Sequence, residues 1–174
     1  ISAGFAVQDF GGDVAVRGGK ILAVGKSLPH VQAATEHDAT GLLITPGWVD
    51  VHTHYDGQVT WDPVVSPPSW HGVTSIVMGN CGVGFAPVKP SDHNMLIELM
   101  EGVEDIPSAA LHEGVPWNWE SFPEFMDALE AMPRAIDVAT QVPHNPVRAY
   151  VMGEDAGTDR PSTTEEREKM AAIV

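Results

Sequence analysis

At residues 46–57 the chain reads Pro46-Gly47-Trp48-Val49-Asp50-Val51-His52-Thr53-His54-Tyr55-Asp56-Gly57, a short apolar run that ends in His-x-His and favours a β-strand. Side chains alternate between the two faces of a strand, so we expect His52 and His54 on one face, with Asp50 on that face one step earlier. Two imidazoles at the end of a stiff strand suit Zn²⁺, although two histidines can also meet by chance in a half-buried strand.

A second candidate ligand follows the next apolar run. Residues 73–78 are β-branched and nearly continuous in apolarity, which predicts a strand covered on both faces. They lead into Gly79-Asn80-Cys81-Gly82, where the glycines permit a sharp turn at the strand's carboxyl end. A lone cysteine is commonly a small buried hydrophobe, so Cys81 by itself leaves ligation and packing both open.

These motifs together resemble a known family. The pattern Pro-Gly-x-x-Asp-x-His-x-His, the run at residues 52–58, His71-Gly72-Val73-Thr74 and Gly79-Asn80-Cys81-Gly82 are similar to the N-acyl-D-amino-acid deacylase (D-aminoacylase) branch of the amidohydrolase superfamily. The resemblance covers nearly the whole chain and is strongest at residues 46–87. It implies one or two Zn²⁺ ions held by His52, His54 and Cys81, with the cysteine in the role that a carboxylated lysine has in related amidohydrolases.

The resemblance also implies an α/β fold, namely part of a (β/α)₈ TIM-type barrel preceded by part of a small β-sandwich. Residues 1–45 would belong to the sandwich, and residues 46–174 would form the first three βα units of the barrel. A complete barrel needs about 250 residues, and the chain has 174 and starts at an isoleucine. We therefore expect an N-terminal fragment of a longer protein.

The remaining pattern predicts alternating strands and helices. Two alternating segments around Gly18-Gly19 predict a hairpin, and residues 42–44 predict a further strand. The other expected elements are a helix at 91–102 capped by Ser91, an irregular insert at 102–119, a helix at 121–132 begun by the capping box of Ser121 and Glu124, a strand at 136–142 and a helix that starts at Thr163.

Two more histidines come near expected strand ends. His144 follows the predicted strand at 136–142, which makes it a candidate substrate contact or an ordinary structural histidine. His71 closes the loop at 57–72, where it could reach the site or simply precede the next strand. That loop contains Trp61 and Trp70, which could anchor it by packing or help to cover a site.

Composition narrows the possible partners. Nine basic and 24 acidic residues give a net charge of −15, and 17 of the acidic residues lie in residues 91–174. A nucleic-acid partner is not expected, because phosphate binding requires the opposite charge. Cys81 is the only cysteine, so no disulfide forms within the chain, and no apolar run approaches the length of a membrane span. The default location is the cytoplasm, and the oligomeric state stays open.

The expected chemistry is zinc-dependent hydrolysis of the amide bond of a small N-acyl-D-amino acid. The resemblance places further histidine ligands and a general acid or base aspartate outside these 174 residues. Asp50, Asn80 and His144 are candidates for substrate contacts or for support of the ligands. The alternatives are a cyclic amidohydrolase of the hydantoinase or dihydroorotase type, which Gly79-Asn80-Cys81-Gly82 disfavours, and a catalytically incomplete fragment or binding module.

Overall fold

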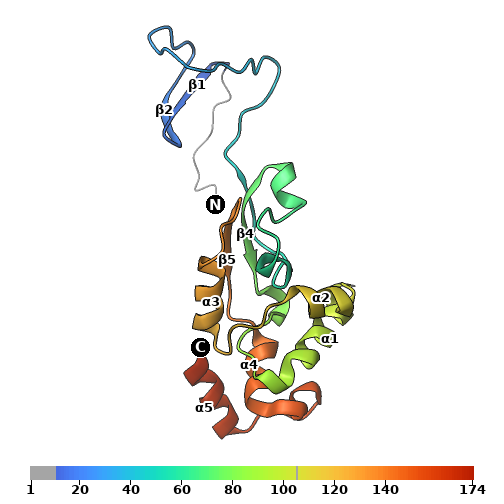
Figure 1. Ribbon diagram of the computed structural model, residues 1–174. Coiled ribbons are helices and arrows are strands. Elements are labelled where there is room, and N and C mark those ends of the chain that lie inside the picture. The colour runs from blue at the N-terminus through green and yellow to red at the C-terminus, as the bar shows by residue number, and fades with distance from the viewer. Residues whose placement is uncertain (1–10, 105) are drawn as a thin grey trace. The chain divides into compact units, whose positions relative to one another are not determined.

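Strand pairing separates the chain into an antiparallel hairpin and a three-stranded parallel sheet (Figure 1). The computed structural model describes residues 11–104 and 106–174. Residues 1–45 and residues 46–174 form two units. The parallel sheet and its helices make the chain an α/β protein, as the sequence predicts.

The hairpin consists of β1 (Asp13–Arg17) and β2 (Lys20–Gly25), and it confirms the prediction from the Gly-Gly turn. Gly18 and Gly19 have φ angles of +58° and +73°, the left-handed conformation that a tight two-residue hairpin turn requires. The pairing register shifts between Ala15 and Val16, which marks a bulge or irregularity in β1.

The prediction of a strand at residues 42–44 is wrong. These residues have no regular secondary structure, and Leu43 is 78% exposed. An extended segment becomes a strand only when neighbouring backbone groups pair with its own, and neither of the two described sheets includes this segment. The apolar character of residues 42–44 was therefore not sufficient to predict a strand.

The parallel sheet has the order β3 (Trp48–Asp50), β4 (Val73–Met78) and β5 (Asp137–Thr140), so neighbours in the sheet follow each other in the sequence. Both pairings are parallel, which places the carboxyl ends of all three strands at one edge. Only two 3₁₀ turns, η1 (Gln58–Thr60) and η2 (Pro68–His71), connect β3 to β4, which agrees with the loop predicted at residues 57–72. The strand at 136–142 is shorter than predicted.

The core forms on one face of β4. Ile76 and Met78 are two residues apart and fully buried, whereas Ser75 and Val77 on the other face are only half-buried. Among the described residues, β4 is therefore fully covered on one face and partly covered on the other, where the sequence predicts cover on both. Leu96, Ile97, Met100, Phe85, Phe125 and Leu129 belong to the same buried cluster.

The helical segment after β4 differs from the prediction at both ends. Helix α1 spans His93–Glu104, and η4 (Pro90–Asp92) precedes it. Ser91 lies inside that 3₁₀ turn, where its hydroxyl donates to the Asp92 carboxylate at 2.7 Å, so it is not the helix cap.

The expected irregular insert contains a second helix, α2 (Ser108–Gly114). Its N-cap residue, Pro107, has no side chain that can accept a hydrogen bond, so the helix lacks a local start signal in the sequence. Its Leu111 is fully buried in the core, and this tertiary contact explains why a short helix forms there.

Both predicted capping boxes are present. Ser121 and Glu124 begin α3 (Phe122–Glu130), which ends two residues earlier than predicted. Thr163 and Glu166 begin α5 (Thr164–Ile173) in the same way. In each box the first side chain accepts from a backbone N–H and the glutamate accepts in return, so both helix starts satisfy their own free donors. Between these helices lie α4 (His144–Met152) and η5 (Gly153–Gly157).

The part of the chain that the structure describes contains no helix that could cross a membrane. None of the helices there combines the length and the apolar character that a bilayer span demands.

The connection at residues 57–72 is organised by one carboxylate. Asp62 accepts hydrogen bonds from the side chain of Gln58, the backbone of Val64 and both the backbone and hydroxyl of Ser66, all at 2.8–2.9 Å. Burial raises the pKa of Asp62, but these hydrogen bonds outweigh burial and hold the pKa at about 2. Trp70 is exposed and therefore does not anchor the connection.

Replacing Asp62 by Asn should lower the free energy of unfolding at pH 7 by about 1 kcal/mol, because hydrogen bonds to a charged acceptor are lost. The lowered pKa means that this stabilisation is complete above about pH 4 and disappears as the pH falls toward about 2. Urea unfolding at several pH values would measure it. Asp127→Asn, an exposed residue of α3, is the control, and an equal effect of the two variants at pH 7 would contradict the assignment.

Candidate metal centre

Three candidate ligands meet beyond the carboxyl edge of the sheet. One donor atom each of His52, His54 and Cys81 lies within 4.8 Å of the other two. His52 Nε2 is 3.0 Å from Cys81 Sγ, and the two imidazole rings are 5.4 Å apart between centroids. Two imidazoles and a thiol form a donor set that suits Zn²⁺, and their close approach without a covalent link fits a shared ion.

The His-x-His segment is not part of a strand, so the prediction from strand alternation is wrong in its mechanism. Strand β3 ends at Asp50, whose carboxylate accepts the backbone N–H of His52 at 3.2 Å. A side chain that takes this N–H competes with the sheet ladder and ends the strand. The chain returns to β4 at Thr53, whose backbone N–H and hydroxyl both donate to the Val77 carbonyl at 2.9 Å.

Cys81 lies in a sharp turn, η3 (Asn80–Gly82), directly after β4. Its own φ is +56°, an uncommon angle for a residue with a side chain. Gly79 has φ of +77°, and a Cβ there would lie 2.2 Å from the Gln141 carbonyl oxygen. Only glycine fits this close approach of the backbone after β5, so Gly79 allows the turn that presents Cys81.

Asn80 connects the ends of all three strands. Its amide nitrogen donates to the carbonyls of Val51 at 3.3 Å and Val77 at 3.1 Å, and its amide oxygen accepts from the Gln141 side chain at 3.0 Å. The side chain therefore holds the His-x-His segment and the Cys81 turn in place. Gln141 was missed, because no motif surrounds it.

One carboxylate lies close to His54, and a second is buried two residues farther along the chain. Glu104 Oε1, from the last residue of α1, is 3.6 Å from His54 Nδ1. Asp56 is 1% exposed, and burial raises its pKa to about 7, with Glu104 adding to the rise and the backbone N–H groups of Asp56 and Gly79 opposing it. The sequence analysis missed Glu104, which is far along the chain and carries no motif.

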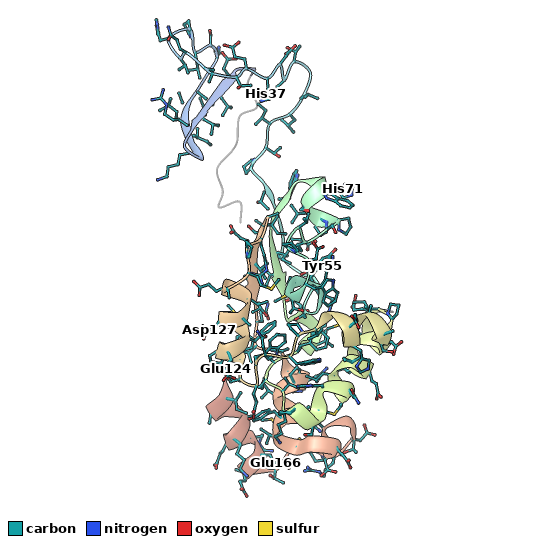
Figure 2. The ribbon with its side chains drawn as sticks, in the orientation of Figure 1. His37, Tyr55, His71, Glu124, Asp127 and Glu166 are labelled. Atoms are coloured by element: carbon teal, nitrogen blue, oxygen red, sulfur yellow. The ribbon has the colours of Figure 1, made fainter. Side chains whose placement is uncertain are left out.

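His71 and His144, the other two candidate histidines, are outside the ligand cluster. His144 is the exposed first residue of α4 and not a strand end, although a Cβ on Gly82 would lie 3.2 Å from its own Cβ. It is thus a neighbour of the Cys81 turn. His71 precedes β4, at the edge of the sheet opposite the ligands. Figure 2 shows it near the start of β4, with Tyr55 farther along the strand.

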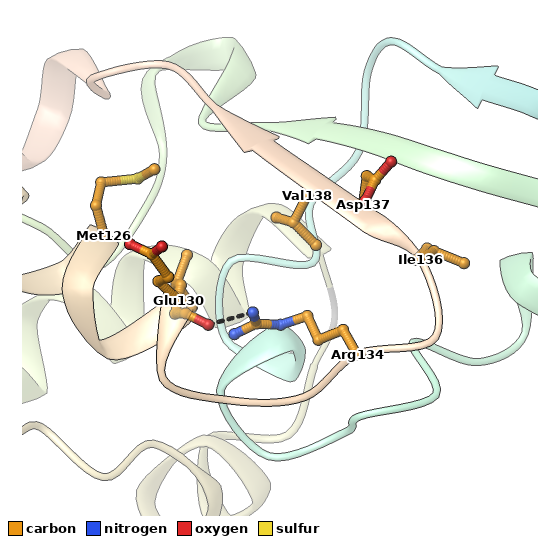
Figure 3. Close-up of a pocket in the computed structure, with 7 residues that line it drawn as sticks. Met126, Glu130, Arg134, Ile136, Asp137 and Val138 are labelled. Atoms are coloured by element: carbon orange, nitrogen blue, oxygen red, sulfur yellow. Dashed lines mark hydrogen bonds between the residues drawn. The ribbon is translucent and has the colours of Figure 1, made fainter. Parts of the chain in front are cut away.

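A pocket of about 400 Å³ is also remote from these ligands (Figure 3). It lies between α3 and the start of β5, where Arg134 donates to backbone carbonyls that include that of Leu129. In parallel α/β folds ligands bind at the carboxyl ends of strands, and this pocket is at the opposite end of β5. Its lining contains none of the predicted site residues.

A family model and two known proteins match most of this chain. The model of the amidohydrolase family Amidohydro_3 matches residues 35–174. The D-aminoacylase of Alcaligenes xylosoxydans xylosoxydans is 34% identical over 154 residues, which cover 88% of this chain and 29% of the relative. The N-acyl-D-aspartate deacylase of the same organism is 33% identical over 163 residues, 94% of this chain and 30% of the relative.

Solved structures of similar deacylases also match this chain. A D-aminoacylase described as having a binuclear metal centre is 33% identical, with a TM-score of 0.74 over 93% of this chain and 31% of that one. The N-acyl-D-glutamate deacylase of Bordetella bronchiseptica, complexed with zinc and a phosphonate inhibitor, is 28% identical, with a TM-score of 0.65 over the same shares. The chain thus spans about 30% of the length of these relatives.

Replacing Asn80 by Ala should lower the free energy of unfolding by about 1–2 kcal/mol, because three hydrogen bonds between strand ends are lost. Urea unfolding of the metal-free protein would measure this effect. Asn94→Ala, at an exposed site on α1, is the matched control and should change stability little. Equal stability of the Asn80 variant and the parent would show that the strand ends are held by other contacts.

Proposed function

Because this chain belongs to the amidohydrolase family, we propose that the full-length protein is a metal-dependent hydrolase that cleaves the amide bond of N-acyl-D-amino acids. The observation that carries the proposal is the meeting of Cys81 with His52 and His54 at the carboxyl edge of the sheet. Relatives that share about a third of their residues with the chain are D-aminoacylase and N-acyl-D-aspartate deacylase, and both names denote this reaction class.

The proposed metal is zinc, as one or two ions, held by His52, His54 and Cys81. The donor set supports it, and a solved relative contains zinc. When bound, zinc supplies Lewis acidity, which lowers the pKa of a coordinated water toward about 7 and polarises a carbonyl oxygen. Zinc binds the thiolate form of a cysteine and the neutral form of a histidine, so metal binding here would release protons.

The surrounding residues have supporting roles in this proposal. Asp50 holds the backbone of His52, and Asn80 holds both ligand segments. His144 is exposed beside the Cys81 turn, where it is available to contact an N-acyl-D-amino acid. These contacts would orient the ligands and the substrate, which is the larger part of what a protein adds to metal chemistry.

The finer fold is part of the same proposal. Three parallel strands in sequence order are how a (β/α)₈ barrel begins, and the likeness to D-aminoacylase structures supports residues 46–174 as its first three units. Residues 1–45, with their hairpin, would form part of a small β-sandwich. The separation of the chain into units at residue 45 is consistent with this division.

A cyclic amidohydrolase of the hydantoinase or dihydroorotase type is the alternative, since it would share the His-x-His motif. The placement of Cys81 beside His52 favours the deacylase, because related amidohydrolases use a carboxylated lysine in that role. A catalytically incomplete chain remains the second alternative, which activity measurements address.

Replacing His52 or Cys81 by Ala in the full-length protein should weaken zinc binding by more than about tenfold and reduce hydrolysis in parallel, because each variant lacks one of the proposed metal ligands. Elemental analysis after dialysis against a chelator would measure the zinc content. His112→Ala, at an exposed site on α2, is the matched control and should retain the metal. Full zinc content and activity in the Cys81 variant would contradict the ligand assignment.

The full-length protein should release amino acid from N-acetyl-D-amino acids at least about tenfold faster than from the L-forms or from hydantoins, given the usual discrimination of a shaped pocket. Parallel assays at equal substrate concentration, with detection of the free amine or the opened ring, would test this expectation. Fastest turnover of a hydantoin would favour the cyclic amidohydrolase instead.

A further inference from the structure

We propose that Glu104 is a positioning residue for His54: its carboxylate accepts the Nδ1–H of the imidazole and thereby leaves Nε2 free to bind the metal. This inference rests on the proposed metal site. It concerns a residue of α1 that is distant from the His-x-His motif in sequence and that no motif marks.

The first observation is an unsatisfied nitrogen. His54 Nδ1 is buried and has no hydrogen-bond partner among the described residues, and the His54 side chain is only 15% exposed. Buried polar atoms nearly always have a partner, because an unpaired one loses its interaction with water. Glu104 Oε1 lies 3.6 Å away, slightly beyond hydrogen-bond length, and the Glu104 side chain is 30% exposed. A small rotation of either side chain would close the contact.

The second observation is where Glu104 lies. It is the last residue of α1, at the negative end of the helix dipole, and the last turn of this helix contains no basic residue. A carboxylate is unfavourable at that end of a helix, so helix stability does not explain a glutamate there. An imidazole N–H that points at the carboxylate offers the compensating interaction.

The consequence concerns which nitrogen of His54 carries the proton. An imidazole that donates Nδ1–H to a carboxylate has its lone pair on Nε2, and such a contact also fixes the rotation of the ring. Glu104 would therefore prepare His54 for a metal before the metal arrives. His52 already directs Nε2 toward Cys81 Sγ, so both imidazoles would offer the same atom.

Zinc affinity of the full-length protein is the first test. Glu104→Ala should weaken zinc binding by about 10- to 100-fold in competition with a chromogenic chelator, as is typical when the partner of a ligating histidine is lost. Glu104→Gln should retain most of the affinity, since its amide oxygen still accepts Nδ1–H. Glu98→Ala, an exposed glutamate of the same helix, removes the same charge and should have no effect. Affinity of Glu104→Ala within about twofold of the parent would overturn the proposal.

The proton on His54 is the second test, and it needs no metal. In ¹⁵N–¹H NMR spectra of the metal-free protein, we expect His54 to carry its proton on Nδ1 in the parent and in Glu104→Gln, and on Nε2 in Glu104→Ala. A parent with its proton on Nε2 would overturn the proposal even if the variants failed to fold. A parent with Nδ1–H that does not bind zinc would instead refute the proposed metal site and support the role of Glu104.

Discussion

The carbonyl oxygen of Val77, near the end of β4, is where the two ligand-bearing segments are joined. It accepts the backbone N–H and the hydroxyl of Thr53 at 2.9 Å each and the side-chain amide of Asn80 at 3.1 Å. Thr53 lies between the two histidines and Asn80 precedes the cysteine. This backbone atom therefore helps to set the distance between imidazoles and thiol, and the residues on either side of it, Ile76 and Met78, are buried in the core.

The ligand segments themselves are irregular, and this irregularity has identifiable causes. Asp50 takes the N–H of His52 out of the sheet, and Gly79 lets the backbone pass against the Gln141 carbonyl. Cys81 then adopts a positive φ that its surroundings must hold. Conformations of this kind are uncommon and concentrate at functional sites, where a rigid frame supports them. Here the frame is the parallel sheet.

The acidic character of the chain also reaches the candidate site. Glu104 Oε1 lies 3.6 Å from His54 Nδ1, and Asp56, two residues after His54, is buried deeply enough to raise its pKa to about 7. The negative charge of Glu104 would attract a cation bound at His54. The same charge would oppose an acidic substrate near this side of the site, so any recognition of a side-chain carboxylate would need cationic groups placed elsewhere.

The sequence by itself determined the features that depend on neighbouring residues. The Gly18-Gly19 hairpin and both capping boxes are local geometries, and they formed as predicted. The grouping of His52, His54 and Cys81 was also expected, because their motifs together resemble those of a known family. Tertiary structure decided the rest. Helix α2 forms through the burial of Leu111, residues 42–44 form no strand because they lack a partner, and Glu104 and Gln141 reach the site only through packing. Contacts between residues distant in sequence leave no local pattern, since their free energy depends on which surfaces meet when the chain folds.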